Sequence, residues 1–253
     1  MSHAENNPAL NGENIRLYSH SGLCNRLQLL SEYKHLSDIK NKNIEMFWVN
    51  SVQCNALFED LFQPIPNINF TYLQQKKKSV RPPNTAQKIG AFSPGKEIVE
   101  RNHLIFCPID SIMETIKSTK NRIGEDYIAC HIRRTDIITI HKKYNIEPPS
   151  DEHFEDFIES HPDRKFYLAT DNLETQNKFI EKFGDRIYYS NIPSGNGSTR
   201  WPRRTTPIQE AVADLFLCID SVDFRGTSCS TFSTFIENYK RAKKCRDRDK
   251  TGV

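Results

Sequence analysis

The chain has 253 residues, of which 26% are charged, and a formal net charge of +3. This length allows one large domain or two smaller ones, and the charge is too small to argue for general nucleic-acid binding. No run approaches the roughly 18 apolar residues that a transmembrane helix requires, and residues 1–13 lack the apolar segment of a signal peptide. We therefore expect a chain without a membrane span.

The seven cysteines are scattered, odd in number and contain no Cys-x-x-Cys pair. Several lie in apolar runs, as buried free thiols do. A reducing compartment, and hence a cytoplasmic location, is the simplest inference.

Apolar runs and helical periodicities alternate along the chain. Strands are predicted over 15–18, 44–49, 68–73, 103–107, 127–132, 165–169, 186–189 and 221–225. Helices are predicted over 55–62, 109–119, 151–160, 173–183, 207–218 and 231–244, with a first helix carrying Leu23, Leu27, Leu30 and Tyr33. Ser150 is a predicted N-cap, Gly184 ends a helix, and the rest of 63–100 is expected to be irregular.

This alternation predicts an α/β fold with parallel sheets, built from two Rossmann-like domains that face a central cleft. The expected domains are residues 14–108 and 109–245. At 253 residues the chain is short for two nucleotide-binding folds, so the N-terminal domain is expected to be reduced.

Four turns that follow predicted strands carry unusual polar content. They are Ser21-Gly-Leu-Cys-Asn-Arg-Leu27, His131-Ile-Arg-Arg-Thr-Asp136, Ala169-Thr-Asp-Asn172 and Arg225-Gly-Thr-Ser-Cys-Ser-Thr-Phe-Ser233. In α/β folds ligands bind at the carboxyl ends of strands, and arginine is the side chain that best grips phosphate oxygens. Hydroxyls at a helix N-terminus add a ready anion site. Each turn alone also fits an ordinary N-cap or an Arg–Asp ion pair, but four on one rim favour a nucleotide-diphosphate site.

These residues resemble a known family. The segments Gly22-Leu-Cys-Asn-Arg-Leu27, His131-Ile-Arg-Arg-Thr-Asp136, Tyr167-Leu-Ala-Thr-Asp171, Ala213-Asp-Leu-Phe-Leu217 and Gly226-Thr-Ser-Cys-Ser-Thr-Phe-Ser233 occur in the order expected of GDP-fucose-dependent fucosyltransferases. The relevant group comprises the α-1,6-, nodulation, α-1,2- and protein O-fucosyltransferases, and the resemblance spans residues 15–240. Cys24 stands where the family usually has the second glycine of its first turn.

The resemblance implies a GT-B-like fold, with an acceptor-side N-terminal domain and a C-terminal domain that binds the GDP-sugar. It implies an inverting transferase that uses no metal and no cofactor beyond the donor substrate. Arg133 would support the departing GDP, and His131 and Asp214 would recognise guanine. Ser230 and Thr231 would contact the pyrophosphate, Asp171 would line the nucleoside pocket, and Asn25 would approach from the N-terminal domain. Arg26, Arg134 and Ser228 complete the expected substrate-binding set.

The general base is open at this point. An inverting transfer needs a group that takes the proton of the acceptor hydroxyl. Asp136 lies at the expected rim, yet it would serve equally to orient Arg133 or Arg134 through an ion pair. Glu147, Asp151 and Glu152 on the following loop are the alternatives.

The sequence thus predicts a glycosyltransferase that moves fucose from GDP-fucose to a glycan hydroxyl. Such an enzyme would act in glycan biosynthesis. Its partners would be the nucleotide sugar and a carbohydrate acceptor, which would enter between loops near 74–100 and 137–150. Two alternatives stay open: a related transferase that uses another nucleotide sugar, and a non-catalytic protein that binds nucleotide sugars or glycans. Nucleic acid is not an expected partner.

Overall fold

The computed structural model describes residues 12–74, 82, 84–86, 95–135, 137–192 and 207–251, without the side chains of 138–140 and 251. The chain divides into two compact units. The first unit comprises Met1–Ile109 and Asn238–Val253, and the second comprises Asp110–Glu237. The boundary therefore falls within the last helix, α8 (Thr231–Thr251).

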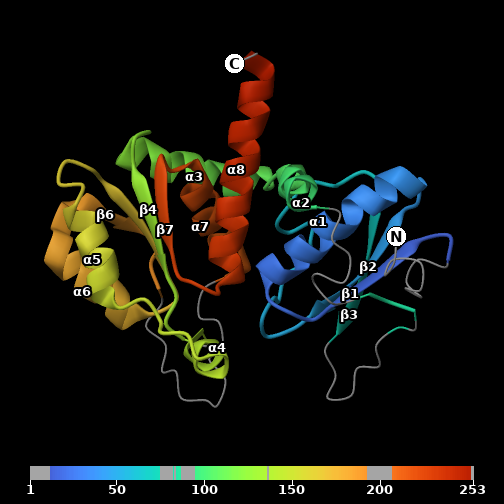
Figure 1. Cartoon of the computed structure of the whole chain (residues 1–253), viewed down its shortest axis with the longest axis horizontal. Helices are drawn as coiled ribbons and strands as arrows, with labels where there is room; N and C mark the ends of the chain where they lie inside the picture. The colour runs from blue at the N-terminus through green and yellow to red at the C-terminus, as the bar shows by residue number, and fades with distance from the viewer. Residues whose placement is uncertain are drawn as a thin grey trace. The chain divides into compact units, whose positions relative to one another are not determined.

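The first unit contains a three-stranded parallel sheet in the order β1-β2-β3 (Figure 1). Its elements are β1 (Ile15–Ser19), α1 (Leu23–Lys40), β2 (Ile44–Asn50), β3 (Ile68–Gln74), α2 (Lys96–Asn102) and the 3-10 helix η2 (His103–Ile105). β1 and β2 are apolar along most of their length and largely buried, as parallel strands covered on both faces are. Helix α1 buries the four predicted positions Leu23, Leu27, Leu30 and Tyr33, so the periodicity identified its inner face correctly.

Aromatic side chains of this unit pack around Trp48. The Trp48 ring lies edge-on to Phe58 and Phe70, with centroids 5.9 Å away in both cases. Phe58 and Phe70 stack at 4.1 Å, and the indole N–H donates to the Ala56 carbonyl at 2.9 Å. The buried ring therefore has its polar group satisfied, as a core tryptophan requires.

The second unit contains a four-stranded, all-parallel sheet in the order β6-β5-β4-β7. Figure 1 labels β6, β4 and β7 of this sheet. Its elements are α3 (Asp110–Ile123), β4 (Ile128–Ile132), α4 (Ile137–Tyr144), α5 (Asp151–Glu159), β5 (Phe166–Thr170), α6 (Leu173–Phe183), the 3-10 helix η3 (Gly184–Arg186), β6 (Ile187–Tyr189), α7 (Ile208–Asp220), β7 (Asp223–Gly226) and the start of α8. Ser150 caps α5 by accepting from the His153 N–H at 3.3 Å, which confirms the predicted cap. Gly184 ends α6 with a φ of 57°, also as predicted.

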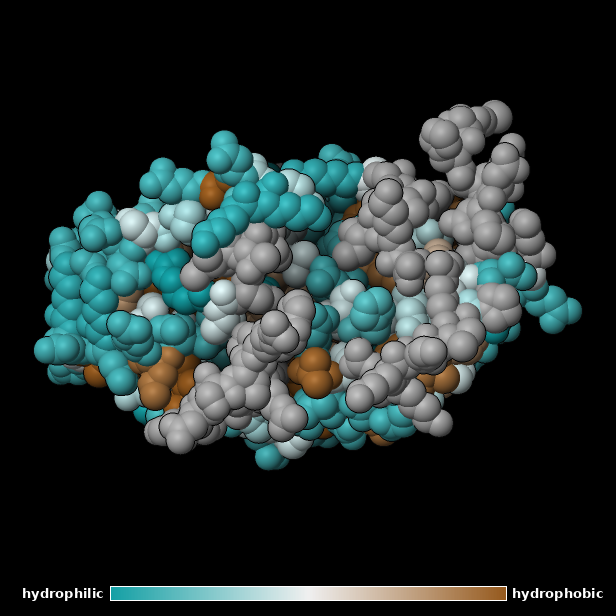
Figure 2. Space-filling model, turned by 90° about the horizontal axis from the view of Figure 1, so that it is seen from below, coloured by the Kyte–Doolittle hydropathy of each residue, from teal (hydrophilic) through white to brown (hydrophobic). Residues whose placement is uncertain are grey.

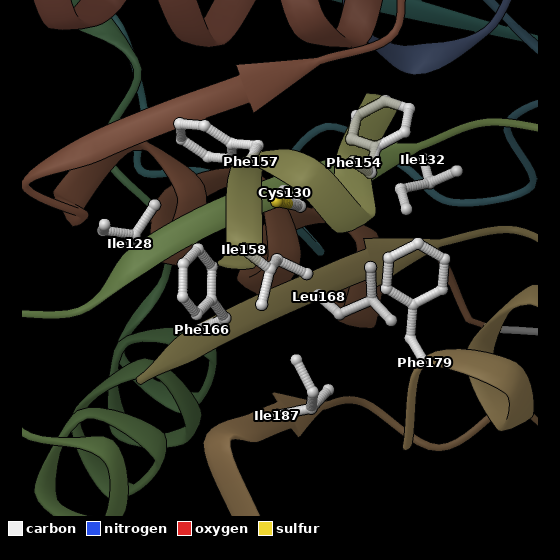
Figure 3. Close-up of a cluster of buried hydrophobic side chains, with 10 residues drawn as sticks. All are labelled: Ile128, Cys130, Ile132, Phe154, Phe157, Ile158, Phe166, Leu168, Phe179 and Ile187. Carbon is white, nitrogen blue, oxygen red and sulfur yellow. The ribbon is translucent and has the colours of Figure 1, made fainter. Parts of the chain in front are cut away.

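Helices cover both faces of this sheet. One face is sealed by the ten side chains of Figure 3, which come from β4, β5, β6, α5 and α6. On the opposite face, the Tyr127 hydroxyl donates to the Leu217 carbonyl of α7 at 2.6 Å, and His131 contacts Ser233 of α8. Odd and even positions of β4 therefore face different helices, which is the alternation expected of a strand.

Four expectations about local structure are wrong. Residues 96–100, expected to be irregular, belong to α2. Residues 103–107 are not a strand, because α2 continues into η2 and the His103 imidazole contacts the Val99 carbonyl one turn earlier at 2.6 Å. Residues 55–62 form turns instead of a helix: the Leu57 N–H donates to Asp60 Oδ2 at 2.9 Å and the Phe58 N–H donates to the Tyr72 hydroxyl at 3.3 Å. Side chains thus take the N–H groups of Leu57 and Phe58, while those of Leu61 and Phe62 both donate to the Phe58 carbonyl. Residues 137–150, expected as a loop, contain α4.

The exposed apolar side chains of the described residues are scattered. Among the described residues, the exposed large apolar side chains are Ile39, Val52, Met113, Tyr144, Ile146 and Val222, spread over different elements. The described residues in the view of Figure 2 are mostly hydrophilic, with separate apolar spots. Within the part of the chain that is described, no helix has the length and apolarity to cross a membrane.

Candidate active site at the β4–β7 switch point

The order of the second sheet creates a natural binding site at one point. From β4 the chain adds β5 and β6 on one side, and it then returns to add β7 on the other side. In open parallel sheets, ligands bind outside the carboxyl ends of the strands where the winding direction changes. Here that point lies between β4 and β7, whose last paired residues are His131 and Gly226.

Arg133 follows β4 at this edge. Its N–H donates to the Thr227 hydroxyl at 3.0 Å, and its Nε lies 3.8 Å from Asp171 Oδ2. The Arg133 side chain is 27% exposed. Its guanidinium is thus tied to the neighbouring turn and is still accessible to a ligand.

Asp171 connects the ends of β4 and β5. It accepts the Arg134 N–H at 2.8 Å and the Thr135 hydroxyl, in addition to the longer contact with Arg133. The carboxylate therefore holds the segment after β4, and its predicted place in the nucleoside pocket stays a prediction.

The Arg134 side chain has different partners from that of Arg133. Its Nη2 donates to Asp151 Oδ1 at 2.7 Å, and its guanidinium lies 5.8 Å from the centroid of the Phe154 ring. Asp151 also receives Lys178 at 2.9 Å. Burial opposes ionisation of Asp151, but the hydrogen bonds from the two cations outweigh it, so the pKa of this carboxyl is lowered. Two adjacent arginines therefore have different environments.

His131 is buried beneath the site. Its Nδ1 lies 2.8 Å from the Ser233 hydroxyl and its ring 4.5 Å from the Phe232 ring. Burial, with a smaller contribution from nearby Arg133, lowers the pKa of His131 to about 3. The ring is therefore neutral at physiological pH, and its predicted contact with guanine stays a prediction.

The turn from β7 to α8 completes this edge. Thr227 is 1% exposed, Ser228 is exposed, and Cys229 adopts a positive φ of 58°. Ser230 precedes α8 with a hydroxyl that is buried and has no hydrogen-bond partner among the described residues. Thr231, the first residue of α8, is exposed. Because the first amides of a helix lack intrahelical partners, this helix start is suited to an anion.

A histidine of helix α4 contacts the same turn. His141, 1% exposed, places Nε2 at 3.0 Å from the Ser228 carbonyl, while its Nδ1 is buried with no partner in the described part of the chain. Neither His141 nor Thr227 was identified from the sequence. His141 lay in an expected loop, and Thr227 was one hydroxyl among several in its turn.

Asp214 lies on α7 beside β5. Its Oδ1 accepts the Tyr167 hydroxyl at 2.6 Å and the Ser190 hydroxyl at 2.8 Å. Burial, followed by the charge of Asp214, raises the pKa of Tyr167 well above its usual range. The predicted guanine contact of Asp214 stays a prediction, and Tyr167 and Ser190 are the residues that orient its carboxylate.

The two predicted residues of the first unit differ sharply. Asn25 is half-buried in the first turn of α1. Arg26 is 0% exposed: its Nε donates to the Ser21 carbonyl at 2.6 Å, and the guanidinium lies 4.5 Å from the centroid of the Trp48 ring. This burial lowers the pKa of Arg26 and favours a role in holding the β1–α1 turn over the predicted substrate contact.

Asp136, the predicted base, lies outside the described residues. Of the alternatives, Glu147 is exposed, Asp151 has the two cationic partners above, and the pKa of Glu152 is lowered by the Ser150 hydroxyl.

A cavity of about 500 Å³ lies elsewhere in the second unit, lined by residues of α6, η3 and β6 with Arg122. This cavity borders the edge of the sheet opposite to β7. We therefore place the candidate site at the switch point because of the strand order and the residues there, and not because of a cavity. In the described part of the chain, no three His, Cys, Asp or Glu side chains gather in a way that would hold a metal ion.

No family model and no curated protein matches this chain. Solved structures do match. NodZ α-1,6-fucosyltransferase soaked with GDP-fucose superposes with a TM-score of 0.57 at 12% identity, covering 88% of this chain and 91% of that one. NodZ from Bradyrhizobium gives 0.60 at 11% identity, with 87% and 90% covered. POFUT1 in complex with GDP gives 0.54 at 11%, with 90% and 95% covered. The chain therefore has the GT-B-like α/β fold of these fucosyltransferases, as the sequence predicted.

Proposed function

We propose that this protein is an inverting, metal-independent glycosyltransferase that transfers fucose from GDP-fucose to a glycan hydroxyl. One observation carries the proposal most: the switch point between β4 and β7 has an accessible arginine and a helix start whose buried hydroxyl has no partner among the described residues. The similarity in fold to NodZ soaked with GDP-fucose and to POFUT1 in complex with GDP supports this choice of donor.

The leaving group defines what the site must do. The acceptor oxygen attacks the anomeric carbon, the bond from that carbon to the β-phosphate oxygen breaks, and GDP departs with the electron pair. Negative charge then grows on the diphosphate. Arg133 and the amides that begin α8 would stabilise it, which is the kind of preorganised electrostatic contact that contributes most to such reactions. Ser230 would donate its hydroxyl to the same phosphates.

The acceptor proton needs a base. Asp151 is a poor choice, because its hydrogen bonds to Arg134 and Lys178 lower its pKa and occupy both oxygens. We therefore keep Asp136 as the proposed base, with Glu147 as the alternative. The roles of His131, Asp214, Asp171, Asn25 and Thr231 in donor binding are part of the proposal.

The first test is nucleotide preference. Calorimetric titration of the purified protein with GDP, UDP and ADP should give the tightest binding to GDP. Tighter binding of UDP or ADP would favour a transferase for another nucleotide sugar, and binding of none would refute the proposal.

The second test is turnover of GDP-fucose. Arg133→Ala should reduce release of GDP by about 10²–10³-fold, the usual cost of losing one group that stabilises the developing charge. Arg164→Ala is the matched control, since Arg164 is an exposed arginine of the same unit whose Nη1 donates to the Asp126 carbonyl at 3.2 Å and lies 4.0 Å from Asp126 Oδ2. GDP-fucose binding without any release of GDP would identify a non-catalytic binding protein.

A further inference from the structure

Thr227 directly follows β7, and its side chain makes hydrogen bonds that the backbone pairing of the strands does not require. Its N–H and its hydroxyl both donate to the His131 carbonyl, each at 3.0 Å. The same hydroxyl accepts the Arg133 N–H at 3.0 Å. One buried side chain therefore links the residue before Ile132 to the residue after it.

This link takes the place of a backbone hydrogen bond that would continue the pairing of β4 with β7. The pairing of β4 with β7 ends at His131 and Gly226, so no β7 carbonyl is paired with the Arg133 N–H. A hydroxyl can donate and accept at once, and here it does both. The backbone of Arg133 is thus held in line with β4 for one residue beyond the sheet ladder.

The side chain is also restrained. Thr227 is 1% exposed, and a β-branched residue has few χ1 rotamers available. The adjoining Ser228 carbonyl lies 3.0 Å from His141 Nε2 on α4. The turn is therefore restrained by contacts with both β4 and α4. A shift of about 1 Å in a group that contacts the reacting bond can cost about 10²-fold in rate, which gives such restraint a purpose.

We propose that Thr227 is a positioning residue, which sets the direction of Arg133 toward the donor diphosphate through this hydroxyl bridge. The proposal rests on the proposed function for the role of Arg133. It is independent of the identity of the base and of the acceptor.

The test compares isosteric variants. Thr227→Val keeps the shape and removes the hydroxyl, and Thr227→Ser keeps the hydroxyl. Without the hydroxyl bridge the Arg133 backbone loses this restraint, so Thr227→Val should weaken GDP binding by about tenfold, whereas Thr227→Ser should stay within about threefold. Thr175→Val, a buried threonine on α6, is the control and should bind GDP like the wild type.

A double-mutant cycle separates positioning from general damage. If Thr227 acts through Arg133, Thr227→Val should weaken GDP binding by less than about twofold when Arg133 is already alanine. An equal loss in both backgrounds would show that Thr227 does not act through Arg133 and would overturn the proposal.

A measurement without ligand completes the test. Hydrogen exchange of the Arg133 amide, followed by NMR, should accelerate in Thr227→Val and not in Thr227→Ser. Should Thr227→Val fail to fold, Thr227→Ala takes its place in both assays. Wild-type protein that binds no GDP would defeat the proposed function, whereas wild-type binding with unchanged affinity and unchanged amide exchange in Thr227→Val would overturn the positioning role alone.

Discussion

Replacing Gly226 by alanine should strain the contact between β7 and the start of α8. A Cβ at this position would lie 2.6 Å from both Cβ and Oγ of Ser233 and 2.9 Å from Cε1 of Phe224. Comfortable carbon–carbon contacts begin near 3.5 Å, so α8 or β7 would have to move by about 1 Å. Overpacking of this size costs about 1–3 kcal/mol.

Thermal unfolding followed by circular dichroism measures this cost, at about 2–4 °C for each kcal/mol in a chain of this size. Gly12→Ala is the control, because a Cβ there has no neighbour closer than 3.6 Å. Ser233→Gly removes both clashing atoms of Ser233, so Gly226→Ala should cost less in that background than in the wild type. A Gly226→Ala protein that melts with the wild type would refute the steric reasoning.

Two further predictions concern buried polar groups. Ser230→Ala removes a hydroxyl that has no partner among the described residues, so urea unfolding should show unchanged or slightly higher stability while GDP binding weakens by about tenfold; a clear loss of stability would count against an unpaired hydroxyl. His131 has a folded pKa of about 3, below its usual 6.5, so the unfolded state binds more protons between these values and stability falls as the pH drops through this window. His131→Asn should therefore lose less stability than the wild type between pH 7 and pH 5 in urea unfolding, although His103, with a pKa lowered to about 4, contributes in both proteins. An equal loss in the two proteins would contradict a buried, neutral His131.

Local sequence determined most of the elements, because strand and helix periodicities and caps act over a few residues. The run at 127–132 and the caps at Ser150 and Gly184 are read correctly for this reason. The segment 103–107 is not, since a run of only four apolar residues after His103 fits a strand or a helical turn equally well. Helix α4 begins with Ile137, Ile138, Thr139 and Ile140, whose β-branched side chains do not favour a helix, and it forms nonetheless.

Only the tertiary structure distinguished the arginines. Arg26, Arg133 and Arg134 all follow strands and all looked suited to phosphate. Packing against Trp48 buries the first, Asp151 engages the third, and the second alone combines the switch point with an accessible side chain.

The convergence of distant turns was likewise a tertiary outcome. The sequence by itself specified which turns are polar, because residue types are a local property. The return of β7 to the far side of β4 decided which turns meet, and it brought Thr227 and the start of α8 to Arg133 across about 94 residues of chain. Strand order depends on how long crossovers pack over the sheet, and no local pattern encodes it.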